Sequence, residues 1–170
     1  MKTLEKNMEK HVKHLEKELQ KIQEEIKKTE EELKEVREEL TKKELEVLET
    51  AKQIRELEHE IHEIKQKLKK NRKALNEADS PRERERLMQD RMKLLEKLHE
   101  VTDQLEKLKA KYNDLTFEEE KLLSKEIELE EKRAKLLRES NIILKKLEDY
   151  MKQIQNKIDR FRELYNLSTM

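Results

Sequence analysis

The sequence predicts an all-α protein, a coiled coil of two very long helices that pair antiparallel. Three observations support this fold class. There is no glycine and only one proline in 170 residues, 48% of the residues are charged, and apolar residues recur every three or four positions. Globular domains need glycine for tight turns and close backbone approaches, whereas long helices do not. Helices with this periodicity meet along a narrow apolar line, here called the seam, formed by the a and d positions of a heptad repeat.

Composition separates this fold from a disordered chain. The hydrophobic fraction is 33% and the mean hydropathy is −1.21, so the chain can form a seam but not a thick core; globular chains have about 45–50% apolar residues. Disordered chains are also highly charged, but they usually carry a large net charge and unphased apolar residues. Here 41 basic and 41 acidic residues cancel, which also argues against general nucleic-acid binding.

The first helix is expected over residues 1–78. With Val12 at an a position, the register runs through ten heptads without an insertion. The a positions are aliphatic throughout, whereas polar residues interrupt the d positions at Thr29, Lys43, Thr50 and Asn71. The predicted aliphatic seam of this block includes Leu19, Ile26, Leu33, Leu40, Ile54, Ile61 and Leu68.

The second helix is expected over residues 84–170, with a break at 79–83. Its d positions are the aliphatic ones, and its a positions are interrupted by Arg91, Glu119 and Arg133. The register extends to Ile154, Lys157, Phe161 and Leu164 at the end of the chain. The predicted aliphatic seam of this block includes Leu94, Val101, Leu108, Leu115, Leu122, Leu129 and Leu136.

Residues 80–83 form a helix start signal between the two blocks. Ser80 can cap the amide of Glu83, and Pro81 suits the first helical position because it has no N–H to lose. The two registers are out of phase by two residues, so the chain must bend, unwind or reverse here. With helices beginning near residues 3 and 81, each would be about 115–130 Å long.

The polar seam residues favour antiparallel pairing. A parallel homodimer would place Lys43, Glu119 and Arg133 against their own copies, which is costly. If the chain folds about residue 81, paired residue numbers sum to about 162 and the aliphatic layers face each other. Unlike polar residues then meet in the remaining layers: Lys43 with Glu119, Thr29 with Arg133, and Asn71 with Arg91.

Two antiparallel arrangements fit these contacts, an intramolecular hairpin and a dimer of kinked helices crossing at residue 81. A turn without glycine disfavours a tight reversal, so the sequence leaves the dimer open. A parallel heterodimer with a complementary partner is also left open.

The second helix has more apolar surface than a two-stranded seam needs. We call the extra residues at its e positions the partner strip: Leu95, Leu123, Leu137, Leu144, Met151 and Ile158. They either widen the seam or dock a further helix.

The remaining motifs are weaker. The pairs His11/His14 and His59/His62 have i, i+3 spacing but no fixed third ligand, so we interpret them as surface residues and expect no metal. Residues 65–73 form a basic run, interpreted as a solvated helix face, with binding to an acidic surface as the alternative. We expect no catalytic site, no cofactor, no small-molecule substrate and no membrane insertion.

The chain resembles segments of long coiled-coil proteins of cilia, centrosomes and microtubule assemblies. The resemblance is carried by Glu/Lys/Leu heptads, such as residues 30–36 and 128–133, and by the Ser-Pro break. The resemblance is compositional and is shared with myosin tails, chromosome-maintenance arms and golgins. It implies an elongated, non-enzymatic scaffold or spacer in the cytoplasm or cytoskeleton that binds coiled-coil partners, either itself or other chains. We also expect a segment of a longer chain. The alternatives are an arm of a nucleic-acid machine and an adaptor whose second helix binds a partner helix.

Overall fold

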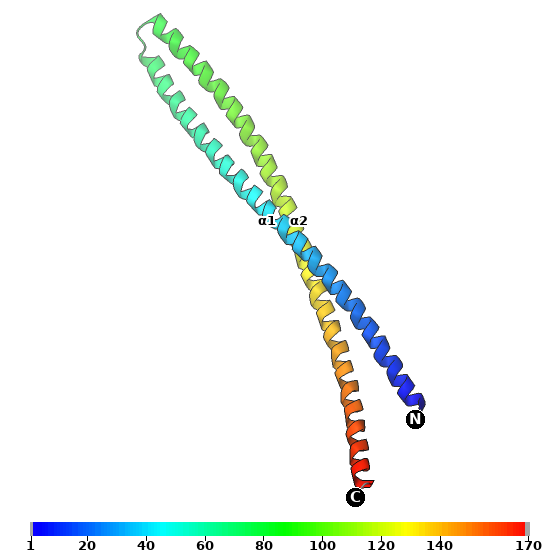
Figure 1. Cartoon of the computed structure of the whole chain (residues 1–170). Coiled ribbons are helices and arrows are strands. Elements are labelled where there is room, and N and C mark those ends of the chain that lie inside the picture. Colours follow the sequence, from blue (N-terminus) through cyan, green and yellow to red (C-terminus); the bar gives the residue numbers. More distant parts are fainter. Residues whose placement is uncertain (1, 169–170) are drawn as a thin grey trace. The chain divides into compact units, whose positions relative to one another are not determined.

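The chain consists of two long helices joined by a short turn. The computed structural model describes residues 2–168, with side chains over 6–166. Helix α1 spans Lys2–Glu77 and helix α2 spans Pro81–Ser168, and all described residues outside 78–80 are helical (Figure 1). The predicted all-α class is confirmed, and α1 and α2 of one chain form an antiparallel helical hairpin.

The turn is shorter than the expected break at 79–83, because α2 begins at Pro81 itself. The Glu83 amide donates to Ser80 Oγ at 3.2 Å, and the Arg84 amide donates to the Ser80 carbonyl at 3.1 Å. The first bond satisfies one of the amides that a helix start leaves unpaired, and the second is the first regular bond of α2. No residue of the described chain has a positive φ. The reversal therefore requires no glycine, contrary to the argument that a glycine-free turn disfavours it.

The hairpin divides into two compact units. The turn unit, Glu38–Leu123, holds the turn and the helical segments on either side of it. The terminal unit combines Met1–Arg37 with Ser124–Met170. Each unit is built from one segment of α1 and one of α2, running antiparallel.

In the turn unit the seam alternates buried and half-buried side chains from both helices. The half-buried ones share their heptad positions with the buried ones and lie on the same face: Ile54, Ile61, Leu68, Leu94, Leu108 and Leu122. The buried apolar residues are Leu40, Ile64, Ala78, Val101, Leu105 and Leu115.

In the terminal unit Leu33 is the least exposed apolar side chain, at 2%, and Leu129 and Leu136 of α2 are also buried. Leu19 and Ile26 are half-buried. Towards the end of α2 the side chains become exposed, and Phe161 reaches 70%. Under the pairing sum of 162, Phe161 would face a position before Lys6, the first described side chain of α1, so no described residue covers it.

Two threonines show how polar residues enter the seam. Thr29 and Thr50 are among the most buried side chains of the described chain, at 1% and 2% exposure. Each hydroxyl donates to the carbonyl four residues earlier, Glu25 and Glu46, at 2.8 Å. Because their own helix satisfies the hydroxyls, these residues pack as small apolar groups.

Candidate protein-binding surfaces

Ion pairs across the hairpin fix its register in the turn unit. Lys43 Nζ lies 2.7 Å from Glu118 Oε2, and Lys97 Nζ lies 3.8 Å from Glu60 Oε1. The residue numbers of these pairs sum to 161 and 157, close to the predicted 162. Lys43 pairs with Glu118 instead of the expected Glu119, which is half-buried. The long lysine side chain reaches out of the seam to the more exposed carboxylate.

The contact with Glu118 also changes the proton affinity of Lys43. The hydrogen bond to Glu118 raises the pKa of Lys43 above its ordinary value of 10.5, partial desolvation opposes this, and the charges of Glu118, Glu46 and Glu39 raise it further. Lys43 therefore stays protonated at neutral pH although it occupies a d position of the seam.

The terminal unit has its own set of cross-helix ion pairs. Arg37 contacts Glu130 at 2.9 Å and Glu126 at 3.7 Å. Arg133 Nε donates to Glu30 Oε1 at 3.2 Å. The sequence predicts Arg133 opposite Thr29, but Arg133 bonds to Glu30, the next residue along α1, on the flank of the seam. Pairs of this exposure stabilise weakly but disfavour other registers and orientations.

Near the turn, Asn71 and Arg91 form the most polar part of the seam. Asn71 Nδ2 donates to the Leu87 carbonyl at 2.9 Å, so the amide bridges the two helices. Two buried atoms, Asn71 Oδ1 and Arg91 Nη1, have no hydrogen-bond partner. Unsatisfied buried polar atoms cost stability, and in coiled coils one polar layer commonly sets the register.

The partner strip of α2 is exposed along its whole length. In the turn unit this holds for Leu95 and Leu123. In the terminal unit it holds for Leu137, Leu144 and Ile158, and Met151 is 70% exposed. These residues keep 41–70% exposure, so the hairpin covers them only in part and their remaining apolar surface is available to another protein.

The sequence analysis missed several exposed apolar residues because all of them except Met88, at an e position, lie at b, c and f positions, outside the stripe that a two-helix seam uses. An apolar count over those positions would have found them: Leu45, Leu48, Met88, Met92, Phe117, Ile127 and Ile142. Phe117 is partly covered by the Lys121 ammonium group, 4.5 Å from the ring centroid.

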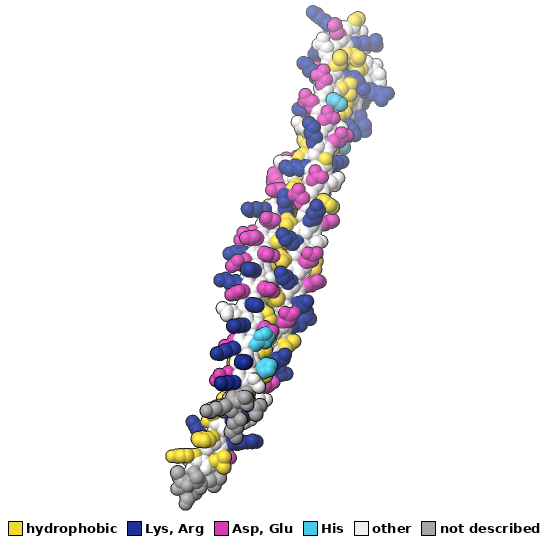
Figure 2. All heavy atoms as spheres, turned by 90° about the vertical axis from the view of Figure 1, so that its right-hand side faces the viewer, with side chains coloured by type: hydrophobic (Ala, Val, Ile, Leu, Met, Phe, Trp, Pro, Cys, Tyr) yellow, Lys and Arg dark blue, Asp and Glu magenta, His cyan; other side chains and the backbone are white. Residues whose placement is uncertain are grey.

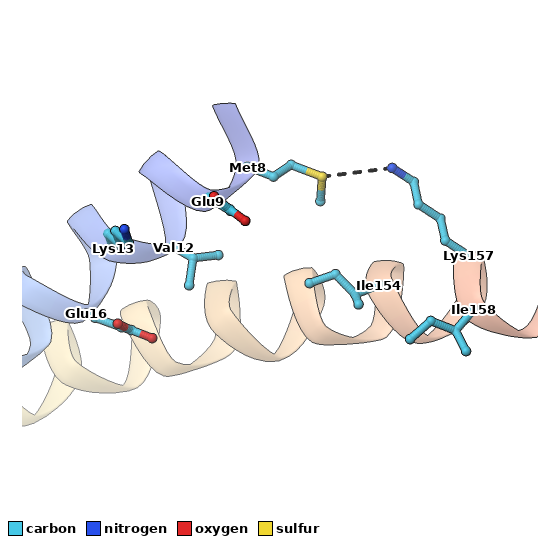
Figure 3. Close-up of a pocket in the computed structure, with 8 residues that line it drawn as sticks. All are labelled: Met8, Glu9, Val12, Lys13, Glu16, Ile154, Lys157 and Ile158. Carbon is cyan, nitrogen blue, oxygen red and sulfur yellow. Dashed lines mark hydrogen bonds between the residues drawn. The ribbon is translucent and has the colours of Figure 1, made fainter. Parts of the chain in front are cut away.

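An open groove of about 630 Å³ lies beside the partner strip in the terminal unit (Figure 3). Val12 of α1 points towards α2, and Ile154 and Ile158 of α2 line the groove with it. Lys157 Nζ approaches Met8 Sδ at 3.9 Å across the groove. The lining is apolar with charged edges, which suits an apolar side chain from another protein more than a polar metabolite.

Within the described part of the chain, the predicted histidine pairs do not form a metal site. His14 contacts Glu18 at 3.0 Å and His59 contacts Glu63 at 3.1 Å, each within its own helix. The ring of His11 stacks on Tyr150, with centroids 6.4 Å apart. Among the described residues there is no group of three or more side chains that could hold a metal ion.

No helix within residues 2–168 has a stretch long and apolar enough to cross a membrane. No protein-family model, curated protein or solved structure matches the chain.

Proposed function

We propose that this chain is a non-enzymatic coiled-coil scaffold or spacer that mediates protein–protein assembly. The observation that carries the proposal is the exposed partner strip of α2. Both helices use their a and d residues in the hairpin, yet the e positions of α2 still present large apolar side chains to solvent. Exposed apolar patches of this kind on a protein surface mark interaction sites.

The microtubule cytoskeleton, including cilia and centrosomes, is the setting we propose for this scaffold. The support is the resemblance of its Glu/Lys/Leu heptads and Ser-Pro break to coiled-coil proteins of those structures. In cells, the fluorescently tagged chain should concentrate on microtubules, centrosomes or cilia. A uniform distribution would refute this setting and leave the scaffold proposal standing.

The strip can be tested by site-specific photo-crosslinking. A photoreactive residue replacing Leu144 should form adducts with another coiled-coil chain or with a second copy. The same residue replacing Leu45 is the matched control, because Leu45 is 62% exposed but lies outside the strip. Equal crosslinking from both positions, or none from position 144, would refute an assembly role for the strip.

An adaptor that captures one partner helix is the second candidate, and the groove in the terminal unit favours it. Val12, Ile154 and Ile158 offer a site for the apolar anchors of one helix. Replacing Ile154 by Gln should then abolish binding of the partner identified by crosslinking, whereas an extended scaffold contact would lose only part of its affinity.

A further inference from the structure

The end of the hairpin that contains the turn carries an excess of positive charge. Residues 65–93, here called the basic tip, include eleven lysines and arginines but only five acidic residues, whereas the whole chain is neutral. The first basic run belongs to α1 and the second to α2, and the reversal at 78–80 brings them together. At the upper end of Figure 2, which holds the turn, Lys and Arg side chains lie next to exposed apolar ones.

Near the turn, α2 also carries a regular row of exposed apolar side chains. Met88, Met92 and Leu95 are 51%, 61% and 45% exposed. Their i, i+4, i+7 spacing places them on one face of the helix, where they can contact one further helix along its length. Methionine is flexible and polarizable, so such a row adapts to the shape of the partner.

Helix α1 carries a row of basic residues near the apolar row of α2. Lys65, Lys69 and Arg72 are exposed and share the i, i+4, i+7 spacing. Lys65 and Arg72 occupy e positions, as do Met88 and Leu95. In an antiparallel pair the e positions of both helices lie on the same side.

An ion pair in the turn unit establishes this geometry. Glu58 and Lys109 are also e residues of α1 and α2, and Lys109 Nζ lies 4.0 Å from Glu58 Oε1. The e positions of α1 and α2 therefore flank each other at Glu58 and Lys109. The heptads that continue towards the turn place Arg72 of the basic row on the same side of the hairpin as Met88 and Leu95.

We infer that the basic tip binds an acidic amphipathic helix of a partner protein. The apolar stripe of that helix would cover Met88, Met92 and Leu95, and its acidic flank would face Lys65, Lys69 and Arg72. Apolar burial would supply affinity, and the complementary charges would set the orientation of the partner.

Two other acidic ligands fit the surface less well. Binding of nucleic-acid phosphates requires the basic row but leaves the apolar row exposed to water. A membrane-surface helix needs a continuous apolar face that enters the lipid. At the basic tip, however, the seam side chains of α2 are occupied by α1, and only the short apolar row is available.

The inference rests on the proposed protein-binding function and shares Leu95 with the partner strip, but it depends on the basic residues and methionines of the turn unit, which the crosslinking test at Leu144 in the terminal unit does not involve. It can be tested with the full chain and a fluorescent designed helix of about three heptads, with Leu along one stripe and Glu on its flanks. Two matched peptides carry Lys in place of Glu, or Gln in place of Leu. Fluorescence anisotropy should show binding of the Glu/Leu helix only, and raised salt should weaken it.

Variants of the chain separate the two contributions. Met88→Gln with Met92→Gln should weaken binding about tenfold or more, and Lys69→Glu with Arg72→Glu should do the same. The charge-reversed chain should gain binding of the Lys/Leu peptide. Leu45→Gln with Leu48→Gln is the control, because both leucines are exposed, at 62% and 64%, and lie outside the basic tip and the partner strip.

Three results would overturn the inference. One is no binding of the Glu/Leu helix. Another is a charge-reversed chain that loses affinity for the Glu/Leu helix while the chain with the methionine substitutions keeps it. The third is tighter binding of duplex DNA or phosphatidylserine vesicles than of the peptide. Strip-dependent crosslinking at position 144 would remain in each case, so the failure of this inference is distinguishable from the failure of the proposed function.

Discussion

The polar layer near the turn gives a prediction in which stability and pairing specificity change in opposite directions. The perturbation replaces Asn71 and Arg91 by Leu together. Two buried atoms without partners, Asn71 Oδ1 and Arg91 Nη1, are removed, and each such atom costs about 1–3 kcal/mol. The change also removes the bond from Asn71 Nδ2 to the Leu87 carbonyl, which contributes about 0.5–1.5 kcal/mol.

The balance favours the double variant. Replacing two buried polar partners by apolar groups can be neutral or stabilising, and for buried ion pairs the gain is about 1–4 kcal/mol. Arg91 is only half-buried, so we expect the lower part of that range, about 1–2 kcal/mol in the free energy of unfolding. Urea denaturation followed by far-ultraviolet circular dichroism should therefore show a higher midpoint with an unchanged slope.

The same variant should be less specific in its pairing. Without a polar layer, apolar seams of other registers and of a second copy become acceptable, because nothing opposes them. Sedimentation equilibrium should show more dimer for the double variant than for the natural chain at equal concentration. A double variant that is less stable than the natural chain would refute the reasoning, because Asn71 and Arg91 would then contribute more than they cost.

Three further predictions concern the seam, the cap and the charges. Leu33→Ala should lower the free energy of unfolding by about 2–4 kcal/mol, because Leu33 is buried. Leu48→Ala, at a 64% exposed site, should leave it nearly unchanged in the same urea experiment. Equal losses would contradict the assignment of Leu33 to the seam. Ser80→Ala should cost about 0.5–2 kcal/mol through loss of the helix cap, measured by thermal unfolding, and an unchanged midpoint would show that the cap is dispensable. Lys43→Glu should destabilise the hairpin and Glu118→Lys should restore it, because the pair is re-formed with opposite polarity; single and double variants that behave additively would exclude this register. Because the pKa of Lys43 is raised in the folded state, the stabilisation from this pair should be complete below pH 10.5. It should decrease as pH rises through the higher pKa of the folded state. Unfolding of the single and double variants over a series of pH values would measure this.

The helices and their antiparallel register follow from the sequence because both depend on local, repeating information. Apolar spacing specifies which face of each helix is covered, and the helix start at Ser80 and Pro81 depends on residues adjacent in the chain. The opposed polar residues favour the antiparallel direction over a parallel homodimer, since a homodimer would place like charges together. The expected layer of Lys43 and Glu119 was nearly right, and the structure differs by one residue.

The tertiary structure decided features that depend on how far a side chain reaches and on what lies beside it. Lys43 reaches past the seam to Glu118, and Arg133 reaches Glu30, because long charged side chains leave a crowded layer for its wetter edge. The hairpin itself also depended on the structure, because the sequence alone permitted both a reversal and a crossing dimer. Three residues without positive φ are enough for the reversal.

The sequence thus determined the helices and their seam and favoured their antiparallel direction, because a heptad repeat encodes burial one turn at a time. It could not show that the residues of the partner strip remain exposed to solvent. Their exposure depends on how much of α2 is covered by α1. Nor could the sequence show that the basic residues of α1 lie beside Met88 and Met92. That juxtaposition arises only when the turn at 78–80 reverses the chain and aligns residues far apart in the sequence.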